Sequence, residues 1–157
     1  FDFYDGTPRT DLVLMISHEL MHMWFYGTIG NDHALEPWLD EAFATYAELL
    51  YYQEYHPSDV EWWWAIRISE QNPQGYVDSD IHLEGGYVPY RNAVYLRGVQ
   101  FLNEVRLAVG DKEFFAALKD YAMTNTWRIA TRQDFFDAIA RHSQADLREI
   151  TARYFAY

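Results

Sequence analysis

Two histidines and a glutamate lie at metal-binding spacing near the start of the chain, where residues 18–22 read H-E-L-M-H. On a helix, residues four apart lie one turn above each other on the same face, so both imidazoles can reach one cation. Glu19 lies about 100° round the helix from His18, close enough to contact a water on that cation without ligating it. This spacing predicts a metal site in which His18 and His22 are ligands and Glu19 is the general base.

A third ligand is available further along the chain. Glu41 follows His22 after 18 intervening residues and falls on a second predicted helix. A histidine taken singly is usually a hydrogen-bonded structural residue, and it is the third acidic residue that favours the metal site over that alternative. Two histidines and one glutamate are a known ligand set for catalytic zinc, which keeps an open position for water. We therefore expect one Zn²⁺ per chain, bound by His18, His22 and Glu41.

The elements that must position these residues are helices. Capping residues and apolar periodicity predict one helix from Thr10 or Asp11 to about Tyr26, and a second from Pro37 to about Tyr55. Both histidine ligands fall on the first helix and the glutamate ligand falls on the second. The metal site is therefore expected at the contact between these two helices.

Helical signals continue through the rest of the chain. A capping box beginning at Ser58 predicts a third helix, and turn residues make 72–90 the longest irregular segment. A helix from about Asn92 to Gly110 has an apolar inner stripe that includes Tyr95. Further helices are expected to begin at Asp111, Thr131 and Asp146, with a short extended piece over 127–130. We predict a mainly α fold, organised as one compact helical unit.

Composition limits the class of protein. The 157 residues fit a single domain over 1–157, and an apolar content of 50% is enough for a packed core. Twelve basic and 24 acidic residues give a net charge of −12, which disfavours nucleic-acid binding. There is no cysteine, so a metal must be bound by His, Asp or Glu. No apolar run reaches membrane-spanning length and no signal peptide is recognisable, which leaves the compartment unknown.

The sequence around the ligands resembles the gluzincin aminopeptidases, the family of aminopeptidase N and its relatives. Their pattern is H-E-x-x-H, eighteen residues and E, with Trp-Phe just after the second histidine and W-L-x-E-[GA]-F-A around the glutamate. Here residues 22–25 read H-M-W-F and residues 38–44 read W-L-D-E-A-F-A. Tyr26 and Ala42 stand where the family more often has glycine, and neither change removes a metal contact.

The resemblance implies a fold and an activity. It implies the helical C-terminal lobe of a thermolysin-like zinc peptidase catalytic domain. It also implies an aminopeptidase that removes N-terminal residues from peptides, with a zinc-bound water activated by Glu19. In that family a tyrosine within Y-x-K-G stabilises the oxyanion, and residues 95–98 read Y-L-R-G, so Tyr95 is expected to take this role. Gly98, on the same helix face, would permit close packing.

The resemblance also implies a missing part. Aminopeptidase relatives bind the free α-amine of the substrate with an upstream G-x-M-E-N segment, and residues 1–18 contain none. Their zinc-bearing lobe packs against an upstream, partly β portion. We therefore expect a fragment of a longer protein, with a peptide substrate and the upstream remainder of the same enzyme as its partners. The choice between exopeptidase and endopeptidase action stays open.

Other residues near the motifs have less specific expectations. Thr45 could hydrogen-bond a ligand histidine or lie on the helix surface. Asp40 is expected to be a solvated or capping carboxylate, and His33 to have a surface or structural role. Tyr90 matches a site-lining tyrosine in some relatives, while the three tryptophans over 62–64 are expected to pack against neighbouring elements.

Two alternative functions remain. The same zinc site could serve another hydrolase, such as an epoxide hydrolase, because relatives with that second activity exist. A non-catalytic relative used as a binding or scaffold domain would be expected to have lost ligands or the base. This chain keeps all of the residues in question, namely His18, Glu19, His22, Glu41 and Tyr95.

Overall fold

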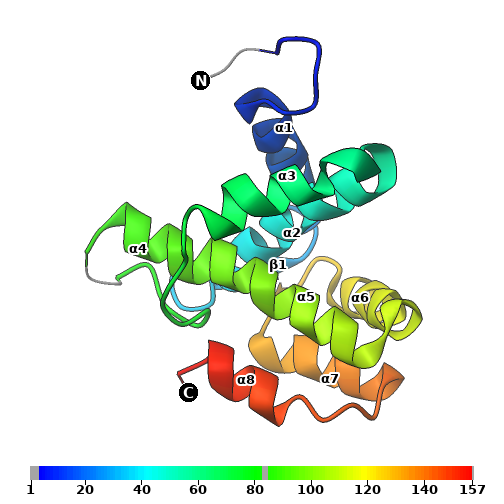
Figure 1. Cartoon of the computed structure of the whole chain (residues 1–157). Coiled ribbons are helices and arrows are strands. Elements are labelled where there is room, and N and C mark those ends of the chain that lie inside the picture. The colour runs from blue at the N-terminus through cyan, green and yellow to red at the C-terminus, as the bar shows by residue number, and fades with distance from the viewer. Residues whose placement is uncertain (1–3, 83–84, 157) are drawn as a thin grey trace.

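The computed structural model describes residues 4–82 and 85–156, and it is mainly helical, as predicted (Figure 1). The two helices of the metal motif are α1 (Asp11–Met21) and α2 (Trp38–Tyr55), and they pack against each other. Thr10 begins α1, where its side-chain oxygen accepts a hydrogen bond from the Val13 N–H group, as N-cap residues do. No helix of the described residues is both long and apolar enough to cross a membrane.

Helix α1 ends five residues before the predicted end at Tyr26. His22 is its C-cap, and the chain then turns tightly, with the Gly27 N–H group donating to the His22 carbonyl at 2.8 Å. Tyr26 has φ of 106°, a backbone conformation that glycine adopts readily and other residues rarely do. A helix cannot contain that conformation, so the apolar periodicity beyond Met21 does not reflect helix.

The central segments differ from the prediction at their starts. A 3₁₀ turn, η1 (Pro57–Asp59), precedes α3 (Val60–Trp64), and a π-helical turn, η2 (Ala65–Ser69), follows it. The predicted capping box is wrong: Asp59 is the N-cap residue, and its carboxylate accepts two hydrogen bonds from Arg9 instead. The helix expected from Asn92 begins earlier, as α4 (Tyr87–Arg91), and runs through a second π-helical turn, η3 (Asn92–Leu96), into α5 (Arg97–Val109).

The C-terminal half follows the prediction closely. It consists of α6 (Asp111–Asn125), β2 (Ile129–Ala130), α7 (Arg132–His142) and α8 (Arg148–Tyr154). Thr131 caps α7 in a capping box with Asp134. Strand β2 pairs in parallel with β1 (Gly30–Asn31), Gly30 opposite Ile129. This short pairing ties the loop before α2 to the C-terminal half.

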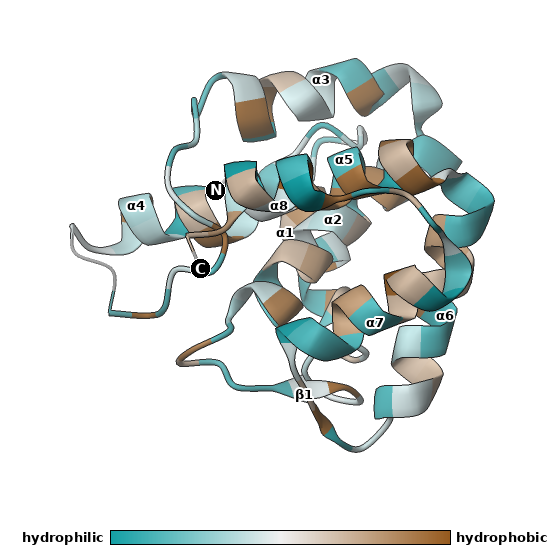
Figure 2. Ribbon diagram, turned by 90° about the horizontal axis from the view of Figure 1, so that it is seen from below, coloured by the Kyte–Doolittle hydropathy of each residue, from teal (hydrophilic) through white to brown (hydrophobic). Residues whose placement is uncertain are grey.

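Helix α2 is the centre of the core and packs against α1, α3 and α5. Trp38 and Phe43, on either side of Glu41, are buried in an aromatic cluster with Phe101, Tyr121, Phe135 and Phe155. Each such ring pair contributes about 0.5–1.5 kcal/mol beyond its buried area. Hydrophilic and hydrophobic residues alternate along α5 and α7, as expected of helices with one face in the core (Figure 2). The cluster thus fixes the part of α2 that carries Glu41.

Candidate metal centre

The three predicted ligands converge at the contact between α1 and α2. His18, His22 and Glu41 each offer one ligand atom, and these atoms all lie within 4.8 Å of one another. Oε2 of Glu41 is 3.3 Å from Nε2 of His18 and 3.7 Å from Nε2 of His22. Tetrahedral zinc with bonds of about 2.0–2.1 Å separates its ligand atoms by about 3.3 Å. The donor set and its spacing therefore fit a zinc ion.

Charge at the site favours a cation. Burial alone would lower the pKa of His18, but hydrogen bonds with Glu41 and Glu48 raise it to about 9. The hydrogen bond with Asp40 raises the pKa of His22. Burial alone would raise the pKa of Glu41, but hydrogen bonds, first that with His18, hold it below its usual value. Several carboxylates thus concentrate negative charge around two imidazoles, which a divalent cation would balance.

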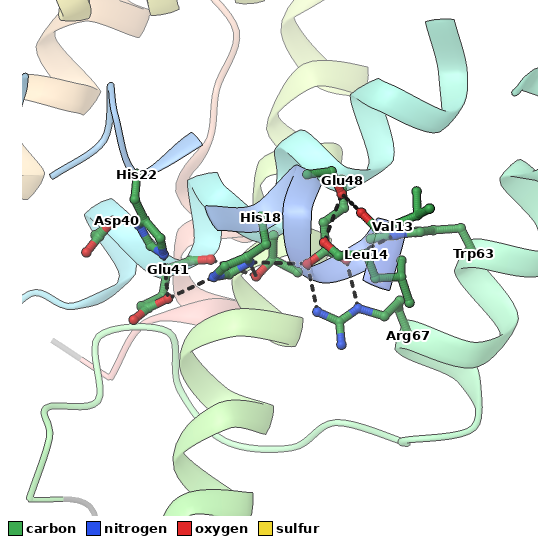
Figure 3. A network of polar contacts seen from close by, with 11 residues as sticks. Val13, Leu14, His18, His22, Asp40, Glu41, Glu48, Trp63 and Arg67 are labelled. Atoms are coloured by element: carbon green, nitrogen blue, oxygen red, sulfur yellow. Dashed lines mark hydrogen bonds and ion pairs between the residues drawn. The ribbon is translucent and has the colours of Figure 1, made fainter. Parts of the chain in front are cut away.

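Behind His18 lies Glu48, which is fully buried. Its Oε1 is 3.2 Å from Nδ1 of His18, and Arg67 donates to both carboxylate oxygens at 2.8 Å (Figure 3). The indole N–H group of Trp63 donates to Oε2 of Glu48 at 3.2 Å, and Trp63 is itself buried, as the packing role expected of it requires. Neither Glu48 nor Arg67 was predicted from the sequence. The signal for Glu48 was its position seven residues after Glu41, on the same face of α2.

Behind His22 lies Asp40, and the expectation of a solvated or capping carboxylate is wrong. Asp40 is only 2% exposed, and its Oδ1 is 2.5 Å from Nδ1 of His22. Its other oxygen lies 3.2 Å from Nδ1 of His33, which has a structural role, as expected. Because Asp40 lies on the face of α2 that meets α1, the side chain is directed at the ligand histidine rather than at solvent.

Thr45 is buried and not on the helix surface. Its hydroxyl donates to the Glu41 carbonyl at 2.7 Å, and its oxygen lies 3.4 Å from Nδ1 of His18. The expected proximity to a ligand histidine is therefore present.

A cleft of about 560 Å³ opens beside the three ligands, and Glu19, Arg67 and Tyr95 also line it. Glu19 is exposed, and its carboxylate has no hydrogen bond or ion pair within the described part of the chain. A hollow of similar volume, about 580 Å³, lies against α8, but none of the described residues that line it is a His, Asp or Glu. The cleft beside the ligands is therefore the candidate active site.

Tyr95 reaches this cleft from the π-helical turn η3. Its ring stacks on that of His18, with centroids 5.9 Å apart and planes inclined by 2°, and its hydroxyl hydrogen-bonds Glu41. Burial, and then Glu41, raise the pKa of Tyr95 above its usual range, so the phenol stays protonated as a donor. Tyr90 packs edge-on against Tyr95 at 5.9 Å, whereas the tyrosine that lines the cleft beside Tyr95 is Tyr87. A site-lining role for Tyr90 stays a prediction.

Comparisons with known proteins agree with this picture. Residues 4–154 match the family model of the peptidase family M1 domain. Aminopeptidase N of Streptomyces lividans is 28% identical over an alignment of 146 residues, which covers 85% of this chain and 17% of that protein. Aminopeptidase N of Lactococcus lactis subsp. lactis is 24% identical over 158 residues, 90% of this chain and 18% of that protein. The chain thus spans less than a fifth of the length of these relatives.

Solved structures share the fold. The crystal structure of an M1 zinc metallopeptidase from Deinococcus radiodurans has a TM-score of 0.66 and 26% identity, covering 85% of this chain and 30% of that one. A mutant of an M1 zinc metallopeptidase from the same organism, bound to a Tyr-Ser-Ala substrate, covers 97% of this chain and 34% of that one, with a TM-score of 0.68 and 23% identity. Together with the match over residues 4–154, the resemblance to aminopeptidase N is confirmed: this chain belongs to peptidase family M1.

Proposed function

We propose that this chain is the zinc-binding part of an aminopeptidase that hydrolyses the N-terminal peptide bond of its substrate. The observation that carries the proposal is the convergence of His18, His22 and Glu41 beside a cleft that Glu19 and Tyr95 also line. The relatives named aminopeptidase N and the neighbours named zinc metallopeptidases support it. Zn²⁺ held by the three ligands would polarise the scissile carbonyl and stabilise the charge that develops on it.

Glu19 is suited to the role of general base. It follows His18 on α1, so its carboxylate lines the cleft without being a ligand, and no partner in the described residues competes for it. A carboxylate in this position takes a proton from the attacking water and returns it to the leaving amine. Because Glu19 is exposed to the cleft, substrate binding would bring it to the reacting atoms.

Tyr95 is suited to stabilising the oxyanion. Burial and the interaction with Glu41 raise the pKa of its hydroxyl, which stays protonated as a donor, and Tyr95 lines the same cleft as the three proposed ligands. Stacking on His18 restricts the ring to this part of the cleft. A donor aimed at a developing oxyanion contributes about 2.7–4 kcal/mol to the transition state.

The substrate class follows from the cleft and from the relatives. A volume of about 560 Å³ lies within the usual range for ligand sites, roughly 300–1,000 Å³, and accommodates one or two residues of a peptide. The restriction to the N-terminal residue rests on the activity that the relatives' names state. The group that binds the free amine would come from the upstream remainder of the enzyme.

Two measurements test the proposal. Elemental analysis of the purified protein should give one zinc per chain, and Glu41→Gln should lose most of it. In the full enzyme, Glu19→Gln should keep its zinc and lose nearly all turnover of aminoacyl fluorogenic substrates. Glu54→Gln, on the exposed face of α2, is the matched control and should change neither. A wild-type protein that binds no zinc, or a Glu19→Gln enzyme with full turnover, would overturn the assignment.

A further inference from the structure

Each ligand histidine has a buried carboxylate on its Nδ1 side. Glu48 occupies this place for His18, at 3.2 Å, and Asp40 occupies it for His22, at 2.5 Å. Both carboxylates are on α2 and both histidines are on α1 or at its end. The layer between the two helices therefore contains two imidazole–carboxylate pairs, arranged so that both Nε2 atoms face Glu41.

Of the two carboxylates, Glu48 has the more extensive set of hydrogen-bond donors around it. It has no exposed surface, and Arg67 donates to both of its oxygens while the Trp63 indole N–H group donates to Oε2 (Figure 3). Arg67 uses both Nε and Nη2 on this one carboxylate, a bidentate geometry that is stronger and more directional than a single contact. A buried carboxylate without such a cation would be strongly destabilising. Arg67 therefore fixes the position of the Glu48 carboxylate.

The hydrogen-bond inventory around His18 leaves Glu48 as the acceptor for the Nδ1 proton. Thr45 is the other oxygen nearby, at 3.4 Å, and its own proton is directed to the Glu41 carbonyl at 2.7 Å. A neutral imidazole has one N–H group and one lone pair, so an N–H bond from Nδ1 to Glu48 leaves the lone pair on Nε2. That lone pair faces the cleft and Glu41.

We propose that Glu48 is a positioning residue that holds the His18 imidazole with Nδ1 protonated and Nε2 free to bind zinc, and that Arg67 holds Glu48 in place. The inference rests on the proposed zinc site and adds the two residues that prepare one of its ligands. Carboxylates hydrogen-bonded to ligand histidines in this way typically change metal affinity roughly 10- to 100-fold when they are replaced. A purely structural Glu48 would affect folding and leave the affinity of the folded protein for zinc unchanged.

A double-mutant cycle separates these roles. The variants are Glu48→Gln, Arg67→Met and the pair combined, and the readouts are zinc affinity, by competition with a chromophoric chelator, and the visible spectrum after loading with Co²⁺. Glu48→Gln should weaken zinc binding roughly 10- to 100-fold and shift the Co²⁺ bands. The double variant should bind zinc equally weakly, because the carboxylate is still missing. Glu104→Gln is the matched control: it also loses an arginine and an aromatic O–H partner, Arg153 and Tyr154, and should bind zinc as the wild type does.

The outcomes are distinguishable. Wild-type zinc affinity in Glu48→Gln would overturn the positioning role. Recovery of zinc affinity in the double variant would also overturn it, because the defect of Glu48→Gln would then come from the unpaired Arg67. If Arg67→Met fails to fold, long-range ¹H–¹⁵N histidine spectra of the zinc-loaded wild type decide the question, since an Nε2-protonated His18 would overturn the proposal. Failure of the wild type to bind zinc would instead refute the proposed function itself.

Discussion

Gly98 on α5 faces Ala42 on α2 so closely that a Cβ atom built on Gly98 would lie 2.3 Å from the Cβ atom of Ala42. Ala42 follows the proposed ligand Glu41, and Gly98 lies one helical turn after Tyr95. The missing side chain therefore lets α5 approach α2 at the level of the site. This approach places Tyr95 where Glu41 raises the pKa of its hydroxyl. The close packing that the sequence predicted for Gly98 is confirmed.

Gly98→Ala should separate these two helices. Overpacking a well-packed contact costs about 1–3 kcal/mol, and here it also displaces Tyr95 from Glu41. We expect lower stability in urea unfolding and lower turnover in the full enzyme, with zinc retained, since no ligand moves directly. The compensating variant Ala42→Gly/Gly98→Ala moves the methyl group from one helix to the other and should recover much of both losses. Equal stability of Gly98→Ala and the wild type would show that the contact is not limiting.

Tyr26→Gly should stabilise the protein. Tyr26 has φ of 106°, and a non-glycine residue in such a conformation costs about 1–3 kcal/mol. Glycine loses about 0.4–1 kcal/mol through the greater freedom of the unfolded chain, which leaves a net gain on the order of 1 kcal/mol. The tyrosine ring is 58% exposed, so little burial is lost.

Tyr26→Ala is the matched control for that variant, because alanine also lacks the ring but keeps the strained backbone. It should be no more stable than the wild type in urea unfolding, and both variants should keep their zinc. If the glycine variant is no more stable than the alanine variant, the backbone at residue 26 stores no strain. If it is more stable than the alanine variant but less stable than the wild type, the ring contact with His33, at 4.4 Å, outweighs the strain.

Tyr95→Phe should separate chemistry from binding. Phenylalanine keeps the stacking on His18 and removes only the donor, so zinc content and stability should stay close to those of the wild type. Loss of an oxyanion donor lowers kcat by about 10²- to 10³-fold, with a smaller change in KM. Steady-state kinetics of the full enzyme measure this, with Tyr76→Phe as an exposed control. A kcat within a factor of three of the wild type would remove Tyr95 from the mechanism.

The convergence of His18, His22 and Glu41 could be predicted because helix geometry converts spacing into direction. His18 and His22 had to share a face of α1, and the third ligand needed only a second helix that packs on it. The supporting carboxylates could not be predicted in the same way. Asp40 and Glu48 look like ordinary acidic residues of a helix until the position of α1 shows which face of α2 is buried.

The predicted helix boundaries were wrong where a local backbone feature ended or began a helix against the apolar periodicity. The positive φ of Tyr26 leaves no periodic trace, so α1 was extended too far. Pro89 counted as a turn signal, yet it lies in the first turn of α4, where a proline is tolerated. Arg67 and Tyr95 lie in the two π-helical turns, which were not predicted and which are frequent at functional sites.

Removing zinc should lower the free energy of unfolding, by an amount that the affinity of the folded protein for zinc sets. A ligand that binds only the folded state at 100 times its Kd contributes about 2.7 kcal/mol, so chelation should lower the urea midpoint and restored zinc should recover it. The carboxylates crowded around His18 and His22 add to the effect, since the metal offsets their mutual repulsion. Glu41→Gln, which lacks one ligand, should show only a small response to zinc at the same concentration. If chelation shifts the midpoint of the wild type and of this variant equally, the stabilising ion lies elsewhere in the molecule.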